Sequence, residues 1–199
     1  ARADLLSSTI LSGTSERDAA GLAIALQSLG ANLFVDADAD RLGFGGSVLT
    51  SGLSGLLTLV AEVLTSASYP TRDVEGERER KVQELAIMRS QAEVTALEAL
   101  MTRMYGSHPY ALMLPQAEDV AAVTPASLRA LHRSRVVPKG SILTLVGDIT
   151  PKRAEALVTK AFATWTAEAA SKEVPKAPKM LGQTALLVHR PGAVQTTIK

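Results

Sequence analysis

The first thirty residues carry apolar positions at helical spacing, in two segments separated by a glycine. Residues 3–12 ("ADLLSSTILS") have leucine and isoleucine at helical intervals and stop at Gly13, a typical helix end. Residues 15–30 repeat the pattern, with Ser15 at the expected N-cap position and Asp18 three residues later, in the arrangement of a capping box. The spacing therefore predicts two consecutive helices.

Alternation replaces this spacing in residues 31–50, where apolar and polar side chains take turns on both sides of an aspartate-rich centre. Such alternation predicts a hairpin of two strands. Helical spacing then returns, with Asp73 as an expected N-cap and Pro125 at an expected first helical position. These patterns predict further helices at 51–64, 73–89, 94–106, 125–136 and 150–165.

Two later segments have the composition of strands, residues 141–149 ("SILTLVGDI") and residues 184–192 ("TALLVHRPG"). Residues 168–182, between them, are rich in Ala, Lys and Pro, which indicates a linker. We therefore expect one domain over residues 1–167, whose N-terminal strands lie outside the chain, and the truncated start of a following domain at 183–199. Both ends of the chain are expected to be cuts in a longer protein.

The order of these elements predicts the fold class. Strands and helices do not alternate regularly along the chain, so a doubly wound parallel sheet is not expected. An α+β fold, in which a layer of helices packs on one face of an antiparallel sheet, accounts better for a hairpin followed by a run of helices.

Composition and charge narrow the functional classes. The 199 residues are 46% hydrophobic and 21% charged, with a formal net charge of +1, which is ordinary for a globular domain. No basic cluster is interleaved with aromatic residues, so a nucleic-acid partner is not expected. Cysteine is absent, which excludes disulfides and thiolate metal ligands, and no apolar run reaches the length of a membrane span.

Histidine-based chemistry is not expected from the residues alone. The only histidines are His108, His132 and His189, and no pair of them has metal-ligand spacing. We predict that His132 is a solvated side chain on a helix and that His108 braces a turn through a backbone hydrogen bond. A serine nucleophile is not expected either, because the chain has no Gly-x-Ser-x-Gly elbow.

Two short motifs resemble ligand-binding loops but have simpler explanations. "GFGGS" at residues 43–47 lies inside the hairpin pattern, so a close backbone approach or a bulge is expected there, not a phosphate loop. "DADAD" at residues 36–40 lacks the spacing of a calcium loop and is predicted to be a solvated hairpin turn.

One charged helix suggests a metal ligand. In "EGERERKVQEL", residues 75–85, Glu77 and Glu84 are seven positions apart and therefore lie on roughly one helical face. A carboxylate that points inward from such a helix is a typical third zinc ligand.

The chain resembles the M16 peptidases, the family of insulinase, pitrilysin and the mitochondrial processing peptidases. The resemblance is carried, in the family's order and spacing, by "GTSERDAAGLAIALQSLGANL", by "LTLVAEVLTSASYPTRDVEGERERKVQEL" and by the stretch from "YGSHPYALMLPQ" to "LVTKAFATW". It covers residues 1–167 and implies the M16 peptidase-like (LuxS/MPP-like) form of the α+β fold.

The same resemblance identifies four positions of interest. Active members carry an inverted zinc motif, H-x-x-E-H, on the helix just before the "GT" of this region. Its three functional positions fall on Asp4, Ser7 and Ser8, none of which is the family residue. The third zinc ligand of the family, a glutamate on a later helix, falls on Glu84. The resemblance thus implies a degenerate metal site with one retained ligand, and no catalytic or metal-binding residue in this chain.

M16 proteins are built from homologous halves or subunits, and in many of them only one half keeps the zinc. The run "ARADLLSSTILSGTSERD" is similar to the small and apolar run of inactive halves. The resemblance therefore implies a non-catalytic domain of a bacterial peptidase, periplasmic or cytoplasmic, that completes the substrate chamber and helps to hold peptide. It places the zinc in a partner half or subunit, and the peptide-binding residues of inactive subunits in a further domain.

Two rival hypotheses remain open at this point. One is an active zinc metalloendopeptidase that uses Asp4 and Glu84 in a nonstandard ligand set. The other is a purely structural protein, similar to the core subunits of respiratory complexes that share the fold without proteolysis.

Overall fold

The computed structural model describes residues 1–168, 175–179, 185–189, 191–192, 194–196 and 198. The chain divides into two compact units, and the boundary between them falls inside one long helix. The hairpin unit comprises residues 2–77 and 123–171, and the α5 unit comprises residue 1 with residues 78–122 and 172–199.

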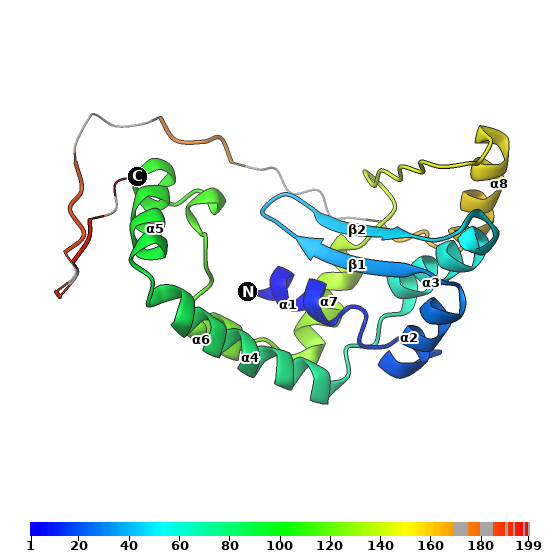
Figure 1. The fold of residues 1–199 in the computed structure, drawn as a ribbon, viewed down its shortest axis with the longest axis horizontal. Helices are drawn as coiled ribbons and strands as arrows, with labels where there is room; N and C mark the ends of the chain where they lie inside the picture. Colours follow the sequence, from blue (N-terminus) through cyan, green and yellow to red (C-terminus); the bar gives the residue numbers. More distant parts are fainter. Residues whose placement is uncertain (169–174, 180–184, 190, 193, 197, 199) are drawn as a thin grey trace. The chain divides into compact units, whose positions relative to one another are not determined.

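The hairpin unit contains the small antiparallel sheet and most of the helices (Figure 1). Its elements are α1 (Arg2–Thr9), α2 (Ala19–Ser28), β1 (Asn32–Ala37), β2 (Leu42–Ser47), η1 (Thr50–Gly52), α3 (Leu53–Ser66), the start of α4 (Thr71–Arg89), α7 (Pro125–Arg135) and α8 (Pro151–Ala161). The α5 unit contains the rest of α4, α5 (Ala92–Tyr105), η2 (Pro109–Ala111) and α6 (Ala117–Ala121). This helix-rich structure with a small antiparallel sheet confirms the predicted α+β class.

The core of the hairpin unit forms where α1 packs against β1 and α7, and where α3 packs against α8. It is built from aliphatic side chains and one tyrosine: Leu5, Leu6, Ile10, Leu22, Leu56, Leu57, Leu59, Val63, Leu64, Tyr69, Val123 and Leu128 are all buried. Removal of this apolar surface from water is the main driving force for the packing of these helices.

The hairpin explains the glycines of the "GFGGS" motif. Phe34 of β1 pairs with Gly45 of β2, and the Phe34 ring lies across Gly45, so a Cβ atom at position 45 would overlap the ring. A Cβ at Gly46 would overlap the backbone carbonyl oxygen of Asn32. The expected close approach is therefore confirmed, and the aromatic ring covers a glycine that cannot cover its own backbone.

The turn of the hairpin is closed by Asp38. Its Oδ1 accepts from the backbone N–H groups of Asp40 and Arg41, at 2.8 and 3.0 Å, and its Oδ2 pairs with the Arg41 guanidinium at 3.0 Å. The backbone N–H groups of Asp40 and then Arg41 lower the pKa of the Asp38 carboxyl. The prediction of a solvated hairpin turn at residues 36–40 is confirmed.

Two predicted helix starts are wrong, and one is confirmed. Asp18, not Ser15, caps α2, since its Oδ1 accepts from Gly21 N at 2.8 Å. Helix α4 begins at Thr71, before the expected cap Asp73, because Pro70 O accepts from Val74 N at 3.0 Å. Thr124 forms the expected start of α7, with a complete capping box.

The predicted strand at residues 141–149 is wrong. The described residues contain one ladder, between β1 and β2, and residues 141–149 pair with neither strand. Strand pattern alone does not form a sheet, because each strand needs an adjacent edge for its backbone groups. Ile142 and Val146 are consequently 92% and 95% exposed.

The C-terminal predictions are tested only in part. Residues 185–189 of the predicted strand 184–192 contain no strand, and its residues 184 and 190 lie outside the described residues. Of the predicted linker 168–182, residues 169–174 and 180–182 likewise lie outside them. None of the helices in the described part of the chain combines the length and apolar character that crossing a membrane requires.

Candidate functional site

Helix α1 carries the three positions at which the resemblance places a zinc motif. Leu5, Leu6 and Thr9 are the buried residues of this short helix. Asp4 and Ser7 are half-buried, and Ser8 is exposed. The sequence therefore places the three side chains together, within little more than one turn of helix.

Both serine hydroxyls are engaged with the backbone of α1. Ser7 Oγ donates to the Asp4 carbonyl at 2.8 Å, and Ser8 Oγ donates to the same carbonyl at 2.9 Å. Such bonds back to the preceding turn are common for serine in helices. Neither hydroxyl replaces an imidazole, because zinc in proteins is bound by Cys, His, Asp and Glu.

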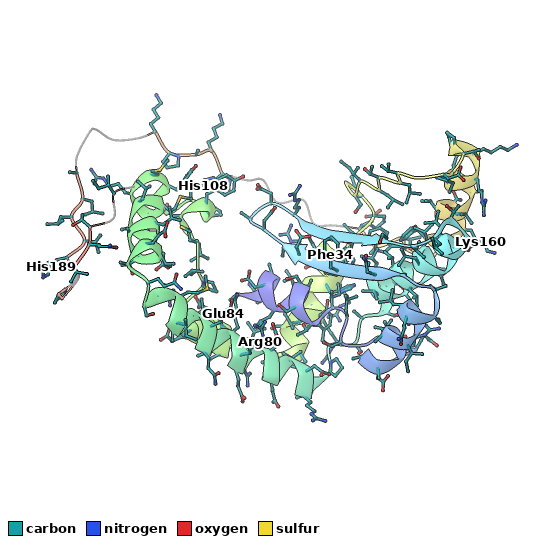
Figure 2. All side chains as sticks on the ribbon, viewed as in Figure 1. Phe34, Arg80, Glu84, His108, Lys160 and His189 are labelled. Carbon is teal, nitrogen blue, oxygen red and sulfur yellow. The ribbon has the colours of Figure 1, made fainter. Side chains whose placement is uncertain are left out.

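Glu84 lies on α4 and is held by basic residues of its own helix. Its Oε2 is 3.3 Å from Lys81 Nζ and 3.6 Å from an Arg80 guanidinium nitrogen, at the i,i+3 and i,i+4 spacings (Figure 2). The Glu84 side chain is 41% exposed. This arrangement is a surface ion-pair cluster on one helix, of the kind that contributes modestly to helix stability.

These residues do not fit a zinc ion. Asp4, Ser7 and Ser8 offer one carboxylate and two hydroxyls, and the Glu84 carboxylate, in the α5 unit, pairs with Arg80 and Lys81. Across the residues that the structure describes, no three His, Cys, Asp or Glu side chains gather closely enough to hold a metal ion. The donor set therefore lacks the two nitrogen ligands that the inverted motif supplies in active members.

His132 is buried, so the prediction of a solvated side chain is wrong. Its ring is 7% exposed and lies between two partners of the hairpin unit: Nδ1 is 2.7 Å from Tyr69 Oη, and Nε2 is 2.8 Å from the Leu64 carbonyl. Position 132 is four residues after buried Leu128 and therefore on the same face of α7. The spacing from Leu128 therefore indicates burial of His132, whereas the neighbouring Arg133 and Arg135 suggest exposure to solvent.

The hydrogen bonds fix the protonation of this pair. The Leu64 carbonyl can only accept, so His132 Nε2 carries the proton and Nδ1 accepts from the Tyr69 hydroxyl. Burial lowers the pKa of His132, with a further lowering by Arg133 and an opposing effect of the Leu64 carbonyl. Burial raises the pKa of Tyr69. Both groups are therefore neutral at pH 7, and their role is structural.

His108 forms the expected backbone hydrogen bond. Its Nδ1 accepts from Tyr110 N at 3.2 Å and caps the short helix η2. The prediction that His108 braces a turn is confirmed, and His189 is exposed.

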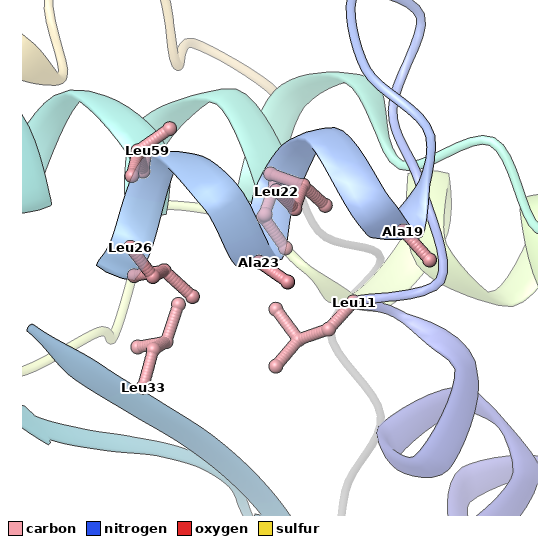
Figure 3. A pocket seen from close by; sticks show the side chains of 8 residues that line it. Leu11, Ala19, Leu22, Ala23, Leu26, Leu33 and Leu59 are labelled. Carbon is pink, nitrogen blue, oxygen red and sulfur yellow. The ribbon is translucent and has the colours of Figure 1, made fainter. Parts of the chain in front are cut away.

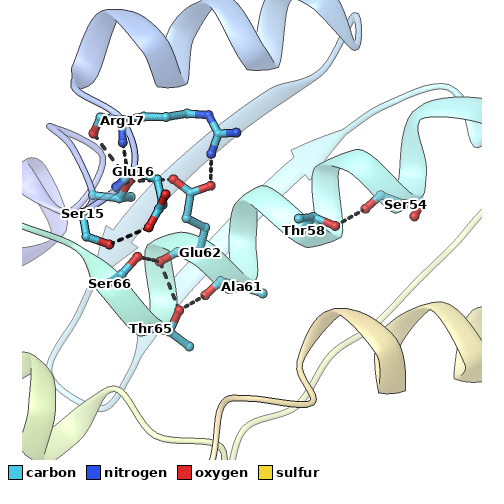
Figure 4. Close-up of polar contacts among 10 residues, drawn as sticks. Ser15, Glu16, Arg17, Ser54, Thr58, Ala61, Glu62, Thr65 and Ser66 are labelled. Carbon is cyan, nitrogen blue, oxygen red and sulfur yellow. Dashed lines mark hydrogen bonds and ion pairs between the residues drawn. The ribbon is translucent and has the colours of Figure 1, made fainter.

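A polar corner joins the segment after α1 to α3 (Figure 4). Thr14 Oγ1 donates to Glu62 Oε1 at 2.6 Å and accepts from the backbone N–H groups of Glu16 and Arg17. Arg17 completes the corner through an ion pair with Glu62. The contacts hold a turn in place and leave no group positioned as a catalytic base.

The hairpin unit also has an apolar pocket of about 190 Å³ between α2, α3 and β1. Its lining consists of Leu11, Ala19, Leu22, Ala23, Leu26, Leu33, Leu59 and Val63 (Figure 3). A catalytic site needs titratable or nucleophilic groups, and none of these eight side chains supplies one.

Comparison with known families matches nearly the whole chain. Residues 2–118 match the family model described as insulinase (peptidase family M16), and residues 122–197 match the model described as the peptidase M16 inactive domain.

Individual relatives are distant. The chain is 25% identical over 199 residues to an uncharacterised zinc protease of Mycobacterium leprae, which covers 98% of this chain and 45% of that protein. An uncharacterised zinc protease of Mycobacterium tuberculosis is 26% identical over 161 residues, 80% of this chain and 37% of the relative. The chain thus spans less than half the length of these relatives.

Solved structures show the same fold. A peptidase M16 inactive domain from Pseudomonas fluorescens superposes with a TM-score of 0.81 at 23% identity, over 89% of this chain and 44% of that one. The periplasmic protease PqqL from Escherichia coli superposes with a TM-score of 0.75 at 20% identity, over 87% of this chain and 20% of PqqL.

Proposed function

The chain belongs to the M16 (insulinase) peptidase family, and from that premise we propose that it completes the substrate chamber of a zinc-bearing partner half or subunit. Residues 122–197 match the model described as the peptidase M16 inactive domain, which is consistent with a non-catalytic part of an M16 protein. In this role the chain binds peptide but does not cut it. The proposed layout has this domain at residues 1–167 and the start of the next at 183–199.

The observation that carries the proposal is the chemistry of α1. At the positions of the inverted zinc motif, the helix has an aspartate and two serines whose hydroxyls donate to the Asp4 carbonyl. Hydrolysis of a peptide by a zinc enzyme requires a metal-bound water, and imidazole ligands hold that metal in the active family members. A helix without imidazoles is consistent with a domain that has lost the reaction.

A role in holding peptide is supported by the hairpin. Asp38 N donates to Arg41 O at the end of the ladder. In an antiparallel pair, residues that hydrogen-bond to the partner strand alternate with residues whose N–H and C=O groups point the other way. The backbone groups of Leu33, Val35 and Ala37 therefore point away from β2. In the described residues the sheet has two strands, so no described strand pairs with this edge of β1. An extended peptide can bind such an edge through main-chain hydrogen bonds with little dependence on its sequence.

The zinc of the proposed assembly belongs to the partner. The relatives from Mycobacterium are described as zinc proteases and are more than twice as long as the matched segment. The solved structures include the whole of PqqL and also its first half alone. These relatives support a protein built from more than one M16-type part, of which this chain is one.

The test is complementation with a zinc-bearing M16 subunit encoded beside this protein, if its sequence has an intact H-x-x-E-H. Quenched fluorescent peptides are incubated with that subunit alone, with this chain alone and with both. We expect the two proteins to form a stable complex and the mixture to cleave the peptides faster than the partner subunit alone. Removal of zinc from the partner should abolish this gain in rate. The structural rival predicts a complex without any gain in cleavage. The active-enzyme rival predicts chelator-sensitive cleavage by this chain alone.

A further inference from the structure

The α5 unit contains a cluster of aromatic side chains around a buried histidine. Tyr105, at the end of α5, and Tyr110, in η2, flank the His108 ring, with centroid separations of 6.0 and 4.7 Å. The two tyrosine rings meet edge to face at 5.8 Å. His108 is 7% exposed, although it lies in a segment that connects two helices.

The second nitrogen of His108 is bonded to a segment 67 residues further along the chain. His108 Nε2 lies 2.8 Å from the carbonyl oxygen of Pro175 (Figure 2 labels His108). Nδ1 accepts from Tyr110 N–H and the Pro175 carbonyl can only accept, so Nε2 carries the proton and donates it. One neutral tautomer thus satisfies both contacts.

The bonded segment has the sequence Pro-Lys-Ala-Pro-Lys, residues 175–179. Its prolines are three residues apart, which is the repeat of the polyproline II helix, so both rings lie on one side of an extended chain in that conformation. Proline-rich segments of this P-x-x-P form bind surfaces lined by aromatic side chains, at a low entropic cost because proline is already restricted.

We propose that Tyr105, His108 and Tyr110 form a docking site for an extended, proline-containing segment, and that residues 175–179 of the same chain are its occupant. The Nε2–H of His108 selects a main-chain carbonyl, and the rings of Tyr105 and Tyr110 hold the His108 ring in position for that contact. The side chains of residues 175–179 are exposed, so the backbone carbonyl makes the contact. The contact attaches the stretch that follows α8 to the end of α5. This docking is independent of peptide binding and of any zinc-bearing partner.

A buried N–H group is costly without an acceptor, which is why the contact with Pro175 matters to His108. Bracing of the turn uses only Nδ1 and does not require a partner for Nε2. Turn bracing and docking of Pro175 therefore depend on different nitrogen atoms of His108, and substitution can separate them. Asparagine places an acceptor near the position of Nδ1, as helix caps require, but is too short to reach Pro175. Glutamine can reach further but is a poor substitute for the cap.

The test is limited proteolysis of the whole chain by trypsin, with the Lys176–Ala177 bond followed by mass spectrometry. When release and docking of the segment are fast relative to cleavage, the cleavage rate is proportional to the fraction of molecules in which the segment is released. We expect His108→Asn to speed cleavage at this bond by about five- to tenfold, the effect of one lost hydrogen bond. His108→Gln should be closer to the unsubstituted chain. His189→Asn is the matched control and should leave the rate unchanged.

Cleavage after Lys160, at the end of α8 in the hairpin unit, monitors the integrity of the fold in the same digests. A His108→Asn chain that is cut at Lys176 no faster than the unsubstituted chain overturns the proposal. So does an equal acceleration at Lys176 and Lys160, because it indicates general unfolding instead of release of the segment. As a second measurement, Tyr110→Ala should speed cleavage after Lys176 and leave the rate after Lys160 unchanged. An unchanged rate of cleavage after Lys176 in this variant would contradict a role of the aromatic rings in docking.

Discussion

Tyr69 Oη lies 2.7 Å from His132 Nδ1, and this contact joins residues 63 positions apart in the interior of the hairpin unit. The two rings also meet edge to face, with centroids 5.7 Å apart. Tyr69 is fully buried and has a backbone φ of 52°, which is unusual for a residue other than glycine. The contact therefore specifies how the connection between α3 and α4 packs on α7.

Tyr69→Phe should destabilise the chain. The substitution keeps the ring but removes the donor, so His132 Nδ1 becomes a buried acceptor without a partner. We expect a loss of about 1–3 kcal/mol in the free energy of unfolding, measured by urea denaturation. Tyr105→Phe, a matched change at a half-buried ring of the α5 unit, should cost less. Equal effects of the two substitutions would contradict a specific role for the Tyr69 hydroxyl.

His132 should make the chain less stable in mild acid. Its pKa in the folded chain is lower than the ordinary value of 6.5, because burial disfavours the charged ring. The stabilising contribution of the neutral ring is therefore fully present above pH 6.5 and declines as the pH falls below that value toward the folded-state pKa. The decline can reach about 1.4 kcal/mol per pH unit for one proton. Unfolding free energies from pH 7.5 to 5 measure it.

The control for this prediction is a comparison of two histidine variants. His132→Gln should reduce the loss of stability in acid, although the variant is less stable at every pH. His189→Gln removes an exposed histidine and should leave the pH dependence as it is. If all three proteins lose stability equally between pH 7.5 and 5, carboxyl groups and not His132 cause the loss.

Local signals predicted much of the helical structure. Thr124 and Pro125 mark the start of α7 through side-chain geometry that requires no distant partner, and the capping box is present. The hairpin was equally local, since its turn is closed by Asp38 within three residues. Ser15 was a reasonable cap that lost to Asp18, because Thr14 already accepts from the following N–H groups.

Contacts with partners far along the chain could not be predicted, although the four-residue spacing of His132 from Leu128 did indicate that His132 is buried. His132 appeared solvated because Arg133 and Arg135 flank it, and only the fold brings Tyr69 and the Leu64 carbonyl to its ring. Residues 141–149 have the pattern of a strand, but a pattern cannot provide the neighbouring edge on which strand formation depends. The contact of His108 with Pro175 is of the same kind.

The unmodified chain should bind no stoichiometric zinc. At the positions where the family resemblance places the two imidazole ligands, the chain has Asp4 and Ser8, and the Ser8 hydroxyl donates to a backbone carbonyl. Elemental analysis after purification with added zinc and removal of free metal measures the content. One tightly bound zinc ion per chain would contradict the non-catalytic interpretation and favour the nonstandard site of Asp4 and Glu84.

We propose that the chain does not hydrolyse peptides by itself, because α1 has no imidazole to hold a zinc ion whose bound water could attack an amide. A library of quenched fluorescent peptides should show no turnover that a chelator abolishes. Cleavage that persists in chelator would indicate a contaminating protease of another class. Chelator-sensitive cleavage by a repurified chain is the result that this interpretation does not allow.

Introducing the inverted zinc motif on α1 tests the assignment of the four positions that the family resemblance identifies. In the triple variant Asp4→His, Ser7→Glu, Ser8→His, the imidazoles at 4 and 8 lie one turn apart on the same face of α1. If the family resemblance assigns Glu84 correctly, the two imidazoles and the Glu84 carboxylate are the three protein ligands of a zinc site, which bind the metal at about 2.0–2.2 Å. We expect zinc binding to appear, with a lower affinity than in a natural enzyme, because natural zinc sites also depend on further groups that orient the ligands, and the triple variant introduces none.

Glu84→Gln in the triple variant decides whether Glu84 is the third ligand. Its carboxylate now pairs with Arg80 and Lys81, so zinc must compete with two cations for it. If Glu84 coordinates the metal, the amide should weaken zinc binding by at least about tenfold, as measured by competition with a chromogenic chelator. Glu79→Gln, on the same helix, is the matched control and should have no such effect. A folded triple variant that binds no zinc, or an affinity that is indifferent to Glu84→Gln, would show that the four positions do not form one site.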